Sequence, residues 1–336
     1  MLKKIFLNLA LISLTLVAIQ VAASTLADKV WAFERTPQKP AIVLAAFGTT
    51  EVGAVESILN IRDKVKAAFP DYDVHLAFTS NIIRGIWHGR DSDAAFKKAN
   101  PKLPAELYSI KNALSVLAGI QEDGARLVLV QSLHVTDGEE YQDLANLVTA
   151  LSKYETLKPV LKPFPWIGVG EPALGLKDGE PAHIERAVKA LAPLAEQAKN
   201  GGQALVLMGH GNEHLTQKVF SKLQDALRKA YGPQVYVGTV EASPGAEEIL
   251  AALKAAKDAP TKVLFAPLMI VAGDHALNDM AGEEADSWVN IFKAGGIETE
   301  TFLKGLGSND SWANIYVEHL QALAPKVQAL QAKDAK

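Results

Sequence analysis

The feature that most constrains the fold is an alternation of short apolar runs with longer amphipathic runs, which continues from about Pro40 to the C-terminus. Short, nearly continuous apolar runs are typical of strands buried on both faces, and the intervening runs have helical spacing. The predicted strands are Ala41–Phe47, Asp73–Thr79, Arg126–Gln131, Lys158–Lys162, Gln203–Met208, Gln234–Val240, Lys262–Pro267 and Glu298–Phe302. This alternation predicts an α/β protein with parallel sheets flanked by helices.

The predicted helices are Val55–Ala68, Ala105–Ala118, Tyr141–Leu151, Pro181–Ala198, Gln217–Ala230, Ala246–Ala256, Glu283–Ala294 and Ser311–Ala332. The helix that begins at Pro181 is long, and Asn200-Gly201-Gly202 follows it, so we interpret it as a crossover between two units. We therefore expect an N-terminal α/β domain over residues 38–180. The C-terminal α/β domain is expected over residues 181–332 and includes the crossover helix and the C-terminal helix.

A weak internal repeat supports two similar halves. The segment Gln131–Glu140 aligns with Ala266–His275 at a constant offset of 135 residues, and the alignment matches Gly138 with Gly273 and Glu140 with His275. A duplicated α/β unit would explain this correspondence.

Residues 1–27 have the pattern of a signal peptide, with Lys3 and Lys4 before an apolar stretch and small residues near Ala23 and Ala27. The apolar stretch is shorter than the roughly 20 residues of a membrane-spanning helix. We therefore expect export to the periplasm with cleavage, and no stable membrane span afterwards; a retained membrane anchor is the alternative.

Composition excludes several kinds of function. The formal net charge is -4, which does not fit a nucleic-acid-binding protein. The chain has no cysteine, so any metal site must use His, Asp or Glu. No phosphate-binding loop of the form G-x-x-x-x-G-K-[ST] is present, so we expect no use of ATP. Gly168–Ala173 matches G-x-G-x-x-A, but the expected helix does not follow at once, so we do not interpret it as a dinucleotide site.

Ligands of parallel sheets bind beyond the carboxyl ends of the strands, so the loops after the predicted strands are the candidate sites. His210 lies between two glycines directly after one strand, and His275 follows Gly273-Asp274 after another. With Glu140, the repeat partner of His275, they form a set of two imidazoles and one carboxylate that suits a divalent metal. Each also has a structural interpretation: a lone His at a strand end is often hydrogen-bonded, and Glu140 suits a helix N-terminus. His214 is equally consistent with a surface position on the next helix.

Several motifs together resemble the anaerobic sirohydrochlorin cobaltochelatases, the ATP-independent class II chelatases, in their periplasmic form. The motifs are Phe47-Gly48-Thr49, Gln131–His134 with Gly138–Tyr141, Met208–Gly211, Val240–Pro244, and Val271–Ala276 with Asn278–Met280. The resemblance implies two similar α/β domains with a tetrapyrrole bound in a cleft between them. It also implies that His210, His275 and Glu140 bind the metal and catalyse its insertion, the three residues that loop position and the repeat had indicated.

The implied activity is that of a lyase that inserts Co²⁺, with Fe²⁺ as the alternative metal, into sirohydrochlorin for a cobalamin-type pathway. The candidates for further contacts with the ring are Thr49, Thr50, Ser80, Arg84 and Glu241. Cobalamin synthesis takes place in the cytoplasm, whereas this chain is expected to be exported. Its tetrapyrrole can therefore differ from that of the cytoplasmic enzymes, and haem is an alternative ligand. A periplasmic protein that binds or transports a tetrapyrrole or a metal on the same fold remains the competing hypothesis, and the sequence leaves open whether the chain forms a homo-oligomer.

Overall fold

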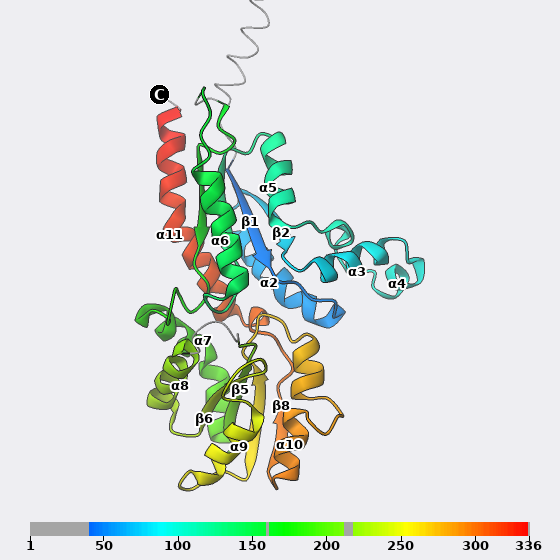
Figure 1. Ribbon diagram of the computed structural model, residues 1–336, viewed down its shortest axis with the longest axis vertical. Coiled ribbons are helices and arrows are strands. Elements are labelled where there is room, and N and C mark those ends of the chain that lie inside the picture. The colour runs from blue at the N-terminus through cyan, green and yellow to red at the C-terminus, as the bar shows by residue number, and fades with distance from the viewer. Residues whose placement is uncertain (1–39, 159–160, 212–217, 335–336) are drawn as a thin grey trace, which may run out of the picture.

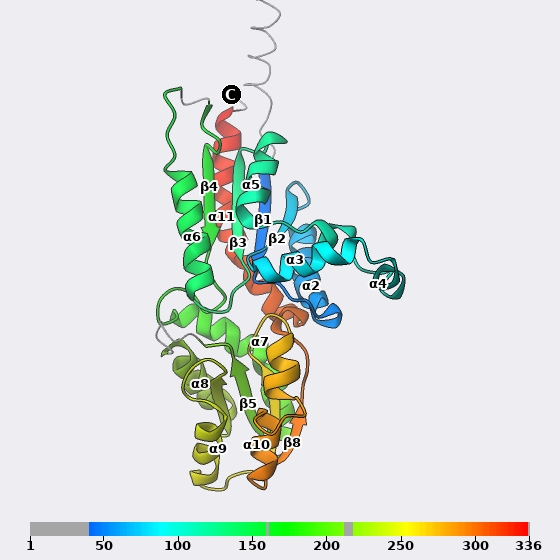
Figure 2. The ribbon, with the colours of Figure 1, turned by 45° about the vertical axis from the view of Figure 1, so that its right-hand side comes forward.

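The structure is a computed structural model that describes residues 40–158, 161–211 and 218–334. Within these residues eight strands form two parallel sheets of four strands each. The first sheet has the order β2-β1-β3-β4 and the second has the order β6-β5-β7-β8. The two sheets therefore repeat one topology, as the internal repeat predicted, and the two units lie one above the other along the long axis (Figures 1 and 2).

The strands of the first sheet are β1 (Pro40–Ala46), β2 (Asp73–Phe78), β3 (Leu127–Ser132) and β4 (Trp166–Gly170). Those of the second are β5 (Ala204–Gly209), β6 (Val235–Thr239), β7 (Lys262–Pro267) and β8 (Glu298–Thr301). All residues of β1, β3 and β5 are buried, which explains why these strands read as continuous apolar runs.

The fourth predicted strand, Lys158–Lys162, is wrong. Its residues 159 and 160 lie outside the described residues, and Leu161 and Lys162 belong to no strand. The edge strand that pairs with β3 is Trp166–Gly170, which contains the glycines of the G-x-G-x-x-A match. Those glycines therefore lie inside a strand rather than in the strand-to-helix turn of a dinucleotide-binding motif.

The helices of the first unit are α2 (Val52–Ala68), α3 (Asn81–Asp91), α4 (Ala94–Ala99), α5 (Ala113–Glu122) and α6 (Glu139–Ser152). The sequence predicted neither α3 nor α4, which follow β2 and project sideways from the body of the molecule (Figures 1 and 2). The single helix predicted over Ala105–Ala118 is instead a short 3-10 helix, Ala105–Ser109, followed by α5.

The second unit contains α7 (Pro181–Asn200), α8 (Lys218–Tyr231), α9 (Ala246–Ala255), a π-helix (Ala276–Met280) and α10 (Trp288–Ala294). After β8 come a 3-10 helix, Leu306–Ser308, and the C-terminal helix α11 (Asp310–Asp334). The sequence grouped α11 with the second domain, but α11 packs against α2, β3 and β4 of the first unit and against α7.

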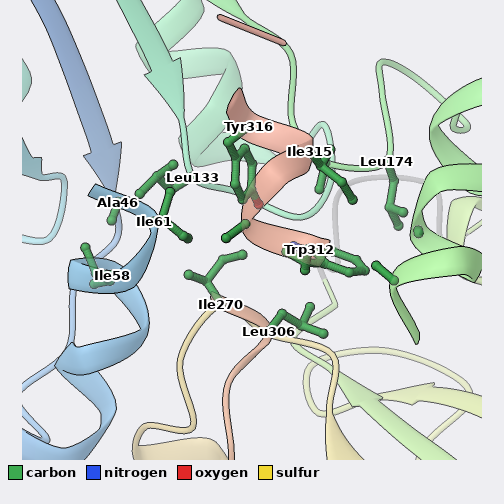
Figure 3. Close-up of a cluster of buried hydrophobic side chains, with 14 of the residues drawn as sticks. Ala46, Ile58, Ile61, Leu133, Leu174, Ile270, Leu306, Trp312, Ile315 and Tyr316 are labelled. Carbon is green, nitrogen blue, oxygen red and sulfur yellow. The ribbon is translucent and has the colours of Figure 1, made fainter. Parts of the chain in front are cut away.

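A continuous apolar cluster joins the two units where α11 begins. Trp312 and Tyr316 of α11 are fully buried there, in the cluster that also contains Ile58 and Leu133 of the first unit and Ile270 of the second (Figure 3). Polar contacts close the same junction, because Ser57 Oγ lies 2.8 Å from Ser308 Oγ. The two units therefore share one core rather than meeting only through a linker.

In the described part of the chain no helix is both long and apolar enough to cross a membrane. The predicted signal peptide, residues 1–27, lies outside the described residues.

Candidate metal centre

His210 is the first residue after β5, at the carboxyl end of the second sheet, and its side chain is exposed. The ring atom Nδ1 lies 2.9 Å from the backbone oxygen of Gly211. Gly211 has a φ of +87°, and a Cβ at this position would lie 2.8 Å from Cβ of Thr239. Only glycine therefore fits the turn that points the imidazole out of the sheet.

His275 lies in the loop after β7, directly before the π-helix. Its Nδ1 lies 2.7 Å from Oδ2 of Asp279, one helical turn further on. A carboxylate only accepts hydrogen bonds, so Nδ1 donates and Nε2 keeps its lone pair. A metal-binding imidazole commonly has such a carboxylate partner, which orients the ring and makes it a stronger ligand.

Glu241 follows β6, the strand beside β5. Two backbone hydrogen bonds hold its loop against the end of β5: Val240 N donates to Gly209 O at 3.0 Å, and Glu241 N donates to His210 O at 2.8 Å. These bonds place the Glu241 carboxylate beside His210.

His210, Glu241 and His275 form one compact group. One ligand atom from each residue lies within 4.8 Å of those of the others, and the two imidazole ring centroids are 4.9 Å apart. His210 Nδ1 also has an acceptor as its partner, so Nε2 of each ring is the atom available to a metal. His210 and Glu241 are exposed and His275 is half-buried, so the group is open to an incoming ion and to a second ligand. Two imidazoles and one carboxylate suit Co²⁺, Fe²⁺, Ni²⁺ or Zn²⁺ and leave further coordination positions free.

The first unit reaches this centre through Thr49, which follows β1 and is buried. A Cβ on Gly273 would lie 3.2 Å from Oγ1 of Thr49, so the loop that carries His275 runs against the end of the first sheet. The carboxyl ends of both sheets therefore meet beside the metal-binding group.

Glu140 does not belong to the group of His210, Glu241 and His275. It lies in the first turn of α6, after β3, where it is half-buried and close to His134. Burial lowers the pKa of His134 to about 4, and the negative charge of Glu140 opposes this shift. Glu140 therefore follows β3 of the first sheet, as His275 follows β7 of the second sheet. The carboxylate that lies beside the two imidazoles is that of Glu241.

The other predicted contact residues lie at the carboxyl edge of the first sheet. Arg90 Nη1 donates to the backbone oxygen of Thr50 at 2.7 Å, and Ser80 is the N-cap of α3, where its Oγ accepts from Ile83 N at 3.4 Å. Arg84 is 9% exposed, and its guanidinium donates to the backbone oxygens of Phe78 and Thr79. The Arg84 guanidinium thus organises the turn after β2 rather than facing outward as an anion-binding group.

Two features of the centre were not predicted. Glu241 was expected to contact the ring rather than to lie within reach of a metal, and Asp279 had no assigned role. The spacing of His275 and Asp279, four residues apart at a helix start, is a signal that could have indicated this pair. His214 lies outside the described residues.

Sequence comparison adds to this geometry. The model of the cobalt chelatase (CbiK) family matches residues 40–324, which include both sheets and the metal-binding group. The chain belongs to this family. A sirohydrochlorin cobaltochelatase of Salmonella typhimurium is 30% identical over 292 residues, which are 86% of this chain and 98% of that protein. A sirohydrochlorin cobaltochelatase of Nitratidesulfovibrio vulgaris is 30% identical over 287 residues, which are 84% and 90% of the two chains.

Two solved structures have the same architecture as this chain. SirB of Bacillus subtilis with Fe³⁺ aligns with a TM-score of 0.56 over 87% of this chain and 98% of its own, at 15% identity. The sirohydrochlorin chelatase SirB of Bacillus subtilis subspecies spizizenii, in complex with cobalt, aligns with a TM-score of 0.54 over the same shares, at 14% identity. At these identities the likeness concerns the fold, and it confirms the predicted chelatase-like arrangement of two α/β units.

Proposed function

We propose that this chain inserts Co²⁺ into sirohydrochlorin, as the names of its relatives state for them. The observation that carries the proposal is the open group of His210, Glu241 and His275, placed where the carboxyl ends of the two sheets meet in a member of the cobalt chelatase family. The same ligands suit Fe²⁺, which is the alternative substrate metal.

The two imidazoles have different partners, and this difference suggests a division of roles. His275 is hydrogen-bonded to the Asp279 carboxylate, which strengthens it as a ligand and favours a lasting hold on the ion. His210 is bonded only to a backbone oxygen, so it is the better candidate to release the ion and then accept a pyrrole proton through Nε2. The Glu241 carboxylate offsets the charge of the ion. One nitrogen cannot bind metal and proton at once, so the two roles of His210 follow each other.

A flat tetrapyrrole needs apolar surface as well as a metal. Phe47 is 48% exposed directly after β1, and Ile82 and Ile86 are exposed on α3, which follows β2. Leu277 is exposed two residues after His275. These side chains come from segments that follow β1, β2 and β7, and we propose that they contact the faces of the ring.

No nucleotide enters this mechanism. The sequence lacks the phosphate-binding loop motif, and the energy for bending the ring comes from binding it between the two units.

We also propose that the protein acts in the periplasm, because residues 1–27 have the charge and hydropathy pattern of a signal peptide. Cell fractionation tests this. The full-length chain should appear in the periplasm in a shortened form, and deletion of residues 1–27 should leave it in the cytoplasm. A full-length chain found uncleaved in the cytoplasm would contradict the proposal.

The proposed activity is tested by anaerobic incubation of the purified protein with sirohydrochlorin and Co²⁺ in many equivalents over protein. We expect the absorption spectrum to convert fully to that of the cobalt complex, at a rate above that without protein. A spectral change that stops at one equivalent would instead show a protein that binds a tetrapyrrole or a metal without releasing it. The same titration with haem would then identify which ring it binds.

The structure also predicts which carboxylate serves the metal. Glu241→Gln keeps the size of the side chain but removes its charge. We expect Co²⁺ affinity to fall by at least about tenfold, because even the loss of a residue that only hydrogen-bonds to a metal ligand has an effect of this size. Glu140→Gln is the matched control, and we expect the Co²⁺ affinity of this variant to equal that of the wild type. Isothermal titration calorimetry with Co²⁺ measures both. If Glu140→Gln weakened Co²⁺ binding and Glu241→Gln did not, Glu140 rather than Glu241 would be the metal-binding carboxylate.

A further inference from the structure

A second group of imidazole and carboxylate side chains lies where β4, α7 and α11 meet. Glu171 follows β4 directly, Glu180 is the N-cap residue of α7, and His183 lies in the first turn of α7. One ligand atom from each of the three lies within 4.8 Å of those of the others. The group shares no residue with the centre formed by His210, Glu241 and His275.

A second imidazole, His319 of α11, packs against His183 with ring centroids 4.9 Å apart. His319 Nδ1 lies 3.0 Å from the backbone oxygen of Glu171, which only accepts, so Nδ1 donates this bond. Nε2, the other nitrogen of this ring, is therefore the atom that can offer a lone pair to a ligand.

Two nitrogens of this group are buried without a hydrogen-bond partner: Nδ1 of His183 and Nε2 of His319. The two residues are 8% and 7% exposed. Buried polar atoms nearly always have partners, and a metal is one kind of partner that a structure of protein atoms alone does not show. His183 is grouped with two carboxylates and His319 packs against it, so the burial of these two nitrogens without partners points to a ligand.

The surrounding charges fit a cation. His183 Nε2 lies 3.2 Å from Glu171 Oε2, and His183 Nδ1 lies 3.6 Å from Glu180 Oε2. A carboxylate therefore lies beside each nitrogen of His183, and the two negative charges favour a cation at this position. Arg186, three residues after His183, pairs with Glu318 at 3.0 Å.

We propose that Glu171, Glu180, His183 and His319 form a second metal site, for a structural Zn²⁺ ion. Imidazole and carboxylate ligands favour Zn²⁺ and its neighbours over Mg²⁺ or Ca²⁺. Ligand atoms around a tetrahedral Zn²⁺ are about 3.3 Å apart, as its bond lengths of about 2.0 Å imply. The carboxylate side chains, 37% and 51% exposed, can move to that spacing. The bound ion links the end of the first sheet to the crossover helix and to the C-terminal helix.

The test counts Zn²⁺ bound after equilibrium dialysis, by elemental analysis of the whole protein. We expect two equivalents in the wild type and one in the double variant His210→Ala, His275→Ala. Adding His319→Asn to the double variant should remove the remaining ion. The asparagine amide can still donate to Glu171 O, so this variant keeps the hydrogen bond and loses the ligand atom. Its Zn²⁺ affinity should fall by more than about 100-fold, because outer partners alone cost 10–100-fold.

Two further variants distinguish the loss of a metal ligand from misfolding of the protein. Glu180 makes no side-chain cap hydrogen bond, so Glu180→Gln should fold normally and still weaken Zn²⁺ binding in the double-variant background. Glu185→Gln is the matched control on the same helix, where Glu185 pairs with the exposed Lys189, and it should keep the ion. The proposal is overturned if the double variant binds no Zn²⁺ at micromolar concentration, or if His319→Asn and Glu180→Gln both bind as tightly as their parent.

This proposal is independent of the chelatase activity. Cobalt insertion should persist in the single variants His319→Asn and Glu180→Gln. Failure of cobalt insertion in the wild type would contradict the chelatase function and leave the zinc count unaffected.

Discussion

His275→Ala should reduce cobalt insertion to the rate of the reaction without protein, and His210→Ala should do the same. Each change removes one of the two imidazoles that lie 4.9 Å apart at the open metal-binding group. The loss should exceed about 100-fold, since disruption of an outer partner alone costs 10–100-fold. Initial rates of formation of the cobalt complex, measured anaerobically at saturating sirohydrochlorin, give the result directly.

Two controls make this prediction specific. Asp279→Asn keeps the shape of the residue that orients His275 but removes its charge, so it should reduce the rate by about 10–100-fold rather than abolish it. His75→Ala removes an imidazole from the half-buried part of β2, far in the sequence from the centre, and should leave the rate unchanged. Wild-type rates in both His210→Ala and His275→Ala would refute the assigned centre, provided that circular dichroism shows the variants to be folded.

Trp312→Ala should cause the largest loss of stability that we predict. Trp312 is fully buried in the cluster that joins the two units, between the first sheet and the loop after β7 (Figure 3). Replacing a buried Trp by Ala costs about 3–5 kcal/mol, because apolar contact is lost and the cavity closes only in part. The free energy of unfolding in urea, followed by circular dichroism, should fall by this amount.

Asn314→Ala is the matched control for Trp312→Ala, because Asn314 is exposed on the same helix and should change stability by less than about 0.5 kcal/mol. Trp312→Phe, which keeps one aromatic ring, should lie between the two. If Trp312→Ala unfolded at the urea concentration of the wild type, the shared core would not be what holds the two units together.

Buried strands were the part of the fold that the sequence revealed best. β1, β3 and β5 are enclosed on both faces, so their residues form continuous apolar runs. β4 was not predicted because two of its five residues are glycines, which have no side chain to add to an apolar run. Helices α3 and α4 were not predicted, and both project from the body: α4 buries no residue and α3 buries only Arg84 and Trp87, so little of either helix belongs to the core.

The site was predictable in part for a similar reason. His210 and His275 follow buried strands of one sheet, and strand ends are where parallel sheets bind ligands. To predict Glu241 as the carboxylate of the group, one would need the order of the strands in the sheet, and local sequence patterns do not reveal that order. Alignment of the repeat matched Glu140 with His275, but equivalent residues of a repeat lie at equivalent points of different sheets. Glu241 approaches His210 because β6 pairs with β5.

The return of α11 to the first sheet has a consequence for the order in which the chain can fold. The first unit ends at β4, yet part of its core is supplied by residues 310–334, which are synthesised after the second unit. While the second unit is still being made, the faces of α2, β3 and β4 that α11 covers stay open to solvent. Exposed apolar surface of this kind is where incomplete chains aggregate or recruit chaperones. The first unit therefore cannot complete its core until the second unit and α11 have been made.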